Sequence, residues 1–159
     1  MAPIRRRLRR VPLFLLQALG VLWALPVSLF GLLAGAVAMA FGARPRLRAR
    51  DLALVFQHFP WGPGGAITLG NVILHTGPDL GCPCHTYAHR AGIGLEPEIV
   101  LADHERAHVY QYMALGVLFL PLYLLAGGAI SARNRFEQAA DRYARSGRGW
   151  WPWSGPGAP

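Results

Sequence analysis

Apolar residues divide the chain into an apolar N-terminal run, an alternating middle part and an amphipathic C-terminal part. Residues 11–41 are almost wholly apolar and carry no charge. A helix needs about 20 such residues to cross a bilayer, and the apolar part of a signal peptide is shorter than this run. The pattern therefore predicts a retained membrane anchor within residues 1–42.

The anchor is either one tilted, kinked helix or a hairpin that enters and leaves the membrane on the same side. Pro26 lies inside the run and would kink or interrupt a helix. Arginines flank both ends: Arg5, Arg6, Arg7, Arg9 and Arg10 in front, and Arg44, Arg46, Arg48 and Arg50 behind. Because arginine-rich flanks stay cytoplasmic, this balance slightly favours a hairpin with both ends cytoplasmic.

Residues 43–96 show the alternation and turn residues of a β-rich and loop region. In a strand over residues 44–56 the arginines would share one face. They either line a basic edge that contacts phosphates or, as we favour, form a stop-transfer cluster. Residues 59–65 predict a turn, and residues 66–75, rich in Ile, Leu and Val, predict a second strand.

Residues 97–146 carry helix signals. Pro97 and Glu98 suit a first helical turn, which predicts a helix over about residues 98–115. Asn134 followed by Glu137 is a capping box that begins another helix. The expected fold is mainly α with a small β-hairpin or sheet. Residues 147–159, rich in Trp, Gly and Pro, are expected to form a disordered tail.

The composition favours a membrane protein. Apolar residues make up 53% of the chain and charged residues 15%, compared with about 25% charged residues in soluble domains. The net charge is +8, and arginine supplies all 16 of the basic residues. Since the arginines stand beside long apolar runs, anionic lipid headgroups are the expected partner, and nucleic acid is not.

The candidate chemistry centres on His104, Glu105 and His108, which form an H-E-x-x-H motif. On a helix, residues four apart share one face, so the two imidazoles can bind one metal ion. Glu105 lies about 100° around the helix and can reach a water on that ion. Two neutral nitrogens beside a carboxylate are what zinc-assisted hydrolysis requires. A solvated pair of histidines is the alternative interpretation.

A second motif, E-x-x-x-D, places Glu137 and Asp141 on one face of the later helix. Glu137 could supply a third zinc ligand, and Asp141 could accept the spare N–H of a liganding histidine. Alternatively, Glu137 is only a capping residue, and Arg133–Glu137 and Asp141–Arg145 are ordinary helical ion pairs. The presence of H-E-x-x-H favours the ligand interpretation.

The two motifs together resemble those of the gluzincin metallopeptidases, particularly the heat-shock membrane proteases and the CaaX proteases. The segment His-Glu-Arg-Ala-His-Val-Tyr-Gln is also similar to that of small bacterial proteins with an H-E-x-x-H-x-x-Q helix. The resemblance covers about residues 98–145. It implies a zincin-like minidomain in a bacterial inner membrane, with His104, His108 and Glu137 as zinc ligands, Glu105 as general base and Asp141 as an orienting carboxylate.

The segment Cys82-Pro83-Cys84-His85, with His89 beyond it, has two interpretations. It could hold a second metal ion, although C-x-C lacks a matching partner motif. We favour a loop that covers the mouth of the active site. From such a loop His89 or Tyr87 could polarise a substrate carbonyl.

The zinc hypothesis requires the chain to fold back. A straight helix from His108 to Glu137 would separate these residues by more than about 40 Å, at 1.5 Å per residue. The apolar stretch between them must therefore turn, either within residues 116–121 or at Gly127 and Gly128. A single membrane span here would place the two motifs on opposite sides of the bilayer.

These observations predict a membrane-associated, zinc-dependent hydrolase whose active region lies at the membrane surface. Its expected substrate is a peptide, and Glu105 would activate the water. The alternative is a non-catalytic membrane protein that binds lipid or protein partners and whose metal site is structural or a relic.

Overall fold

The computed structural model describes residues 3–94, 98–128 and 131–154, with side chains from Leu13 onward. Helices dominate, and a small mixed sheet and a short strand pair accompany them, so the predicted fold class is confirmed in these terms. The helices are α1 (Pro3–Met39), α2 (Tyr87–Arg90), α3 (Leu101–Leu115), α4 (Phe119–Leu125) and α5 (Arg135–Ser146). The strands are β1 (Arg44–Arg48), β2 (Ala53–Gln57), β3 (Ala66–Leu69), β4 (Val72–His75), β5 (Pro83–Cys84) and β6 (Ile99–Val100).

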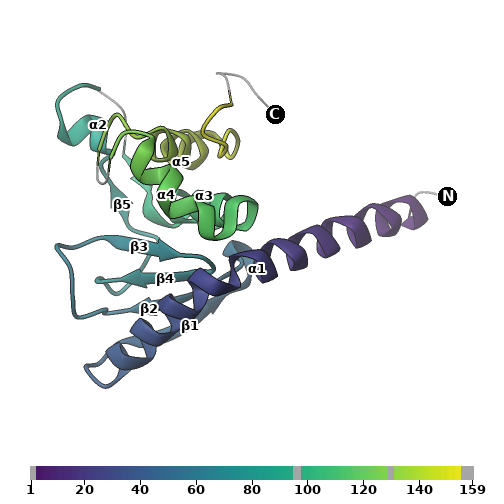
Figure 1. Ribbon diagram of the computed structural model, residues 1–159, viewed down its shortest axis with the longest axis horizontal. Coiled ribbons are helices and arrows are strands. Elements are labelled where there is room, and N and C mark those ends of the chain that lie inside the picture. Colours follow the sequence, from purple (N-terminus) through teal and green to yellow (C-terminus); the bar gives the residue numbers. More distant parts are fainter. Residues whose placement is uncertain (1–2, 95–97, 129–130, 155–159) are drawn as a thin grey trace.

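The elements form layers. Figure 1 shows the sheet, α3 and α5 in succession, with α1 running across the sheet and projecting beyond the body. The sheet has the order β1-β2-β4-β3, in which β2 and β4 are parallel and the outer pairs are antiparallel. Apolar residues of β2 and β4 are buried beneath α3, with Val55 and Ile73 at the centre. The sheet and α1 thus support one side of α3.

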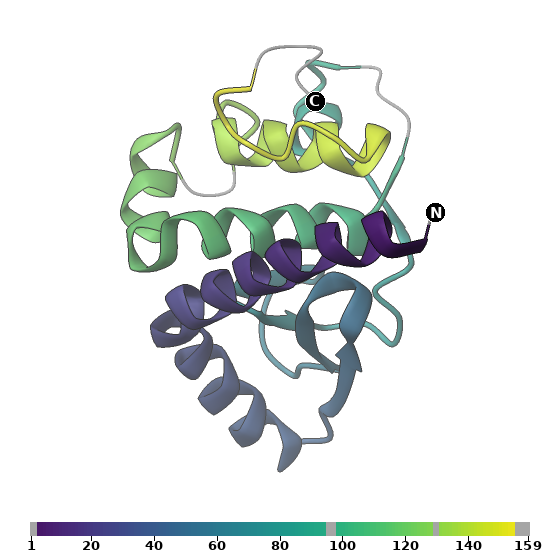
Figure 2. The same cartoon turned by 90° about the vertical axis from the view of Figure 1, so that its right-hand side faces the viewer.

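The N-terminal run forms one helix, which corrects the slightly favoured hairpin. Figure 2 shows α1 bending near its middle, as expected where Pro26 removes one backbone donor. Ala24, Val27 and Ala38 are buried along one face at helical spacing. Gly35 lies directly against Phe56 of β2. The helix continues past the proline because tertiary contacts hold both halves.

In the described part of the chain, two stretches are long and apolar enough to cross a membrane. They are Leu13–Met39, of 27 residues, and Leu101–Leu125, of 25 residues. Core helices and N-terminal signal sequences can meet the same criterion. The second stretch is not one straight helix, because α3 ends at Leu115 and the chain turns at Gly116.

The expected single strand over residues 66–75 is wrong: these residues form the hairpin of β3 and β4. Gly70 at the turn adopts a φ of 64°, which favours glycine. The adjacent Asn71 donates its backbone N–H to Ser28 of α1 and its side-chain amide to Leu52. The pair Gly70-Asn71 between two apolar runs is a typical two-residue hairpin turn, so the sequence did carry a signal for it.

The helix that carries H-E-x-x-H begins later than predicted, at Leu101. Ile99 and Val100 pair instead with β5, while Glu98 precedes them in the chain and Pro97 lies outside the described residues. The required fold-back is present and uses both expected regions. Gly116, with φ 56°, ends α3 against Trp23, and the chain turns again at Gly127 before α5.

The tail also differs from the expected disordered segment as far as Ser154. The backbone carbonyl of Trp150 accepts a hydrogen bond of 2.8 Å from Gln111. The ring of Trp153 packs edge-on against Phe136, with centroids 5.7 Å apart. Residues 150–153 therefore cover the contact between α3 and α5. Aromatic packing, which composition alone does not specify, explains the difference.

A buried ion pair ties α3 to the sheet. The Arg106 guanidinium contacts Asp51, which is fully buried between β1 and β2, at 2.6 Å. Asp103 on the same helix lies 2.8 Å from another nitrogen of Arg106. Because Asp51 joins the sheet to α3, it fixes the position of the helix that carries the two histidines.

We expect Asp51→Ala to lower the free energy of unfolding by about 1.5–3 kcal/mol, because it removes the buried partner of Arg106 and leaves only the half-buried Asp103. Chemical denaturation of the two purified proteins would measure the difference. Asp79→Ala, at an exposed position, is the matched control and should have little effect. Equal losses in the two variants would contradict a structural role for the pair.

Candidate metal centre

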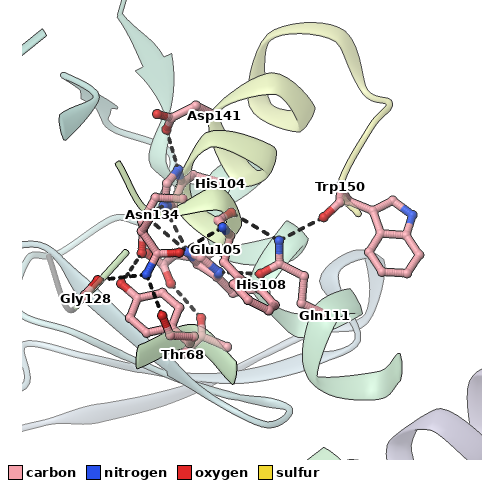
Figure 3. A network of polar contacts seen from close by, with 12 residues as sticks. Thr68, His104, Glu105, His108, Gln111, Gly128, Asn134, Asp141 and Trp150 are labelled. Carbon is pink, nitrogen blue, oxygen red and sulfur yellow. Dashed lines mark hydrogen bonds and ion pairs between the residues drawn. The ribbon is translucent and has the colours of Figure 1, made fainter. Parts of the chain in front are cut away.

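The predicted ligands meet between α3 and α5. Figure 3 shows His104, Glu105 and His108 on α3, with Asp141 facing them from α5. His104, His108 and Glu137 are only 8%, 7% and 5% exposed. Within the described ranges, these three residues lie close enough to one another to hold a single metal ion. The fold thus brings together residues that are 33 positions apart in the sequence.

The three candidate ligand atoms lie at distances that suit a tetrahedral ion. His104 Nε2 is 3.0 Å from Glu137 Oε2 and 3.1 Å from His108 Nε2. The third edge, from His108 Nε2 to Glu137 Oε2, is 3.5 Å. Ligand atoms around a tetrahedral zinc ion, with bonds of about 2.0–2.1 Å, lie about 3.3–3.4 Å apart. The three atoms therefore match one face of a zinc coordination tetrahedron.

Hydrogen bonds on the far side of each imidazole orient these nitrogens. Asp141 Oδ1 accepts from Nδ1 of His104 at 2.9 Å, as predicted from E-x-x-x-D. Gln111 Oε1 accepts from Nδ1 of His108 at 2.8 Å. When each Nδ1 carries the proton, Nε2 presents its lone pair to a metal. Both rings are thus held in the tautomer that a ligand requires.

Sequence reasoning missed the role of Gln111. The amide nitrogen of Gln111 donates to the carbonyls of Phe136 and Trp150, which leaves its oxygen facing His108. The available signal was spacing, since Gln111 follows His108 by three residues and shares its helix face. Its carbonyl partners come from α5 and the tail, and the sequence does not place either beside it.

Sequence reasoning also missed Tyr123. Its hydroxyl donates to Glu137 Oε1 at 2.5 Å, leaving Oε2 toward the histidines. Asn134 caps α5 by accepting from the N–H of Phe136, and its amide donates to the carbonyls of Tyr123 and Gly128. Asn134 therefore caps the helix as predicted, but the capping box is not completed, because the N–H of Asn134 donates to Ser131 and Glu137 contacts the histidines and Tyr123. The start of α5 thus carries both a helix cap and a candidate metal ligand.

Glu105 points to the sheet side of the centre. The hydroxyl of Thr68, on β3, donates to Glu105 Oε2 at 2.6 Å. A cavity of about 90 Å³ adjoins Glu105, His104 and Asp141. Its other walls include Cys84, His85, Thr86, Tyr87 and Arg90, together with Gly64, Gly65 and Ala66. The segment predicted to cover the active-site mouth does line the cavity beside Glu105.

Residues 82–89, the segment expected to cover the site, are not part of a group that could hold a second metal ion within the described ranges. His85 stacks on His89 with ring centroids 4.3 Å apart, and its Nε2 lies 3.5 Å from Glu98. Burial, with the nearby Cys82 and carboxylates, raises the pKa of the Cys84 thiol to about 11. The Cys84 thiol is therefore protonated at neutral pH when no metal is bound.

Tyr87 in this segment remains a hydrogen-bond donor at neutral pH. Burial raises the pKa of its hydroxyl to about 12, and the negative charges of Glu137 and Glu105 act in the same direction. The ring belongs to α2, whose first turn is capped by Thr86 through a hydrogen bond to the N–H of His89. The cavity therefore has a carboxylate and a protonated phenol in its wall.

Without a metal, the centre binds a proton. Burial opposes a charge on His104, but hydrogen bonds to Asp141 and Glu137 outweigh it and raise its pKa to about 10. Burial would raise the pKa of Glu137, but the charges and hydrogen bonds of His108 and His104 hold it far below its usual range. The buried cluster thus attracts positive charge.

Comparisons with known protein families, with curated proteins and with solved structures found no match. The chemistry of the centre is therefore inferred from its own residues and their geometry.

We expect the protein in EDTA to lose stability as the pH rises from 6.5 toward 10. The pKa of His104 rises on folding from its usual 6.5 to about 10, so its protonation stabilises the folded chain below this window and is lost across it. Thermal unfolding at several pH values would measure the effect. Bound zinc should add more stability as pH rises, because its ligands must be deprotonated.

Asp141→Asn serves as the matched variant for this measurement. It keeps the size of the side chain but removes a negative charge that favours the protonated His104. The loss of stability should therefore still begin near pH 6.5, but it should end at a lower pH and be smaller in total. An unchanged pH profile in the variant would contradict the assignment of this titration to His104.

Proposed function

We propose that the protein is a membrane-associated, zinc-dependent hydrolase that cleaves peptide bonds. The observation that supports this most directly is the set of three distances, 3.0, 3.1 and 3.5 Å, between buried Nε2 and Oε2 atoms. Each Nδ1 also has its own acceptor, Asp141 for His104 and Gln111 for His108, so both Nε2 atoms can face a metal. The arrangement resembles a zinc ligand set with its orienting partners.

Zinc suits these residues better than calcium or magnesium. Two imidazoles and one carboxylate form a nitrogen-rich donor set, whereas those two metals prefer oxygen ligands. Catalytic zinc sites use three protein ligands and keep a further position for water. In such a site the ion lowers the pKa of water and polarises a carbonyl.

In the proposed reaction, Glu105 is the proton carrier. Its carboxylate would take a proton from the attacking water and pass it to the leaving amine, while the oxygen of water stays on the new carboxylic acid. Thr68 holds Oε2 of Glu105 by its hydrogen bond of 2.6 Å. The other oxygen is then the natural acceptor for the proton.

Tyr87 lines the cavity beside Glu105, and in the proposed reaction it would assist at the substrate carbonyl. Its raised pKa keeps the phenol protonated, so it can donate to oxygen as negative charge develops there. The substrate would lie along β3, which is the last strand in the sheet order and contains Thr68. Its outer edge can add an extended peptide strand, with Ile67 exposed beside it.

The first test is the metal content of the detergent-purified protein. We expect about one zinc ion per chain in the wild type, and its loss or marked weakening in His108→Ala and Glu137→Ala, which remove ligands from opposite helices. Glu98→Ala is the matched control, because this glutamate contacts His85 and lies outside the cluster. Zinc that persists in Glu137→Ala would exclude the proposed ligand set.

The second test separates catalysis from structural metal binding. Glu105→Gln should retain zinc but lose about 10²–10⁴-fold in cleavage of a fluorogenic peptide library, the usual contribution of a general base. Thr68→Val should reduce turnover less, because it removes only the hydrogen bond to Glu105. The opposite outcome is a wild type that binds zinc stoichiometrically but cleaves no peptide of the library, as does Glu105→Gln. The metal site would then be structural.

A further inference from the structure

The outer surface of α1 is apolar although its inner surface is already buried. The inner face, at Ala24, Val27 and Ala38, packs on the body. The opposite face carries large exposed apolar side chains, namely Leu22, Leu25, Leu29, Leu33 and Val37. Helices on the surface of soluble domains normally present polar residues there. This second apolar face needs another apolar partner.

The surface extends beyond α1. The 3₁₀ turn Gly116–Leu118 packs against α1 at Trp23, and its Val117 and Leu118 are exposed. An apolar groove of about 620 Å³ also runs between α1 and the C-terminal part of α3. Leu16, Gly20 and Trp23 line it on one side, and Tyr110, Met113 and Trp150 on the other. Groove and helix face together form a broad apolar area.

The charges at the ends of this surface favour a lipid bilayer. No charged residue occurs between Arg10 and Arg44, while arginines are clustered on both sides of that interval. At the C-terminal end, the exposed rings of Phe41 and Trp61 lie 5.3 Å apart near Arg44. Aromatic rings beside arginines are typical of the headgroup region of an anionic membrane.

The packing of α1 argues against a simple transmembrane span. From Gly20 onward the helix lies against the body, first at Met113 and then at Val72 and Phe56 of the sheet. Moving all of α1 through a bilayer would carry the edge strand β1, with exposed Arg44 and Arg46, into hydrocarbon. Open sheet edges are not stable there.

The projecting part of α1 is too short to span the bilayer by itself. Its apolar residues are 11–20, in the half of α1 that extends beyond the body in Figure 1. These ten residues cover about 15 Å, half of the hydrocarbon thickness of about 30 Å. A helix that spans would also have to bury the preceding arginines.

We propose that α1 lies in the plane of one leaflet, with its outer face and the α1–α3 groove against lipid acyl chains. The arginine clusters at both ends then contact headgroups of that same leaflet. In this arrangement the cavity beside Glu105, at the N-terminal end of α3 and away from Met113 in the groove, would open toward water. The idea that a substrate enters this cavity from the aqueous phase rests on the proposed hydrolase function. The lipid contact of α1 does not depend on that function.

The test places single cysteines at the two ends of α1 in the full-length chain. On a Cys82→Ser and Cys84→Ser background, Arg7→Cys and Leu47→Cys are expressed separately, and membrane vesicles of each orientation are prepared. An impermeant maleimide should label both positions in the same vesicle orientation. Labelling of the two positions in opposite orientations would show a span and overturn the proposal.

Lipid contact is tested with a fluorophore at Leu33→Cys on the same background, in vesicles that contain spin-labelled anionic lipids. Ile93→Cys is the matched control, since Leu33 and Ile93 are apolar and 66% and 70% exposed. Quenching should be several-fold stronger at position 33 than at 93. Equal quenching at the two positions, or efficient disulfide formation between two chains through position 33, would overturn lipid as the occupant.

Discussion

The structure depends on one electrostatic contact, in which buried carboxylates of α5 face buried imidazoles of α3. Burying isolated charges in a protein interior is strongly unfavourable, and the cluster is stable only when a shared cation, a proton or a metal ion, balances the carboxylates. Asp141 and Gln111 each accept a hydrogen bond from the Nδ1 atom of one ring. The Nε2 atoms of His104 and His108 therefore point toward Glu137. The contact therefore determines how α3 and α5 pack as well as what they can bind.

The rest of the fold holds these two helices in register. Asp51 ties α3 to the sheet through Arg106, and Thr68 reaches Glu105 from β3. On the other side, Gly116 and Gly127 allow the chain to reverse direction and bring α5 back. Asn134 then joins the start of α5 to Tyr123, the residue that orients Glu137. Each support is polar and directional, as a site that must hold ligand geometry requires.

The second organising feature is an apolar helix with two apolar faces. One face of α1 replaces part of a protein core, because Gly31 and Gly35 let β4 and β2 approach closely. The other remains exposed along its length. If this exposed face contacts lipid, as proposed above, one helix serves both as core and as membrane surface and would hold the metal centre at a constant height above the lipid.

Local patterns in the sequence were sufficient for several elements of the centre. Spacing of four predicted that His104 and His108 share a face, and the length constraint predicted a reversal between His108 and Glu137, because helix geometry is the same in every protein. The capping role of Asn134 follows from the same local rules. Two boundaries were predicted wrongly. The interpretation of residues 66–75 as a single strand overlooked the Gly70-Asn71 turn between β3 and β4, and α3 appeared to begin before Leu101.

Long-range contacts decided the remainder. The sequence by itself determined the ligand types, their helical spacing and the apolar length of α1. Only the tertiary structure showed that Gln111 orients His108, that Tyr123 orients Glu137, that the tail reaches Gln111, and that α1 continues past Pro26. Those contacts join residues that are separated in the chain or depend on packing on both sides of a helix. Residue type and periodicity describe one element at a time, whereas these features arise where elements meet.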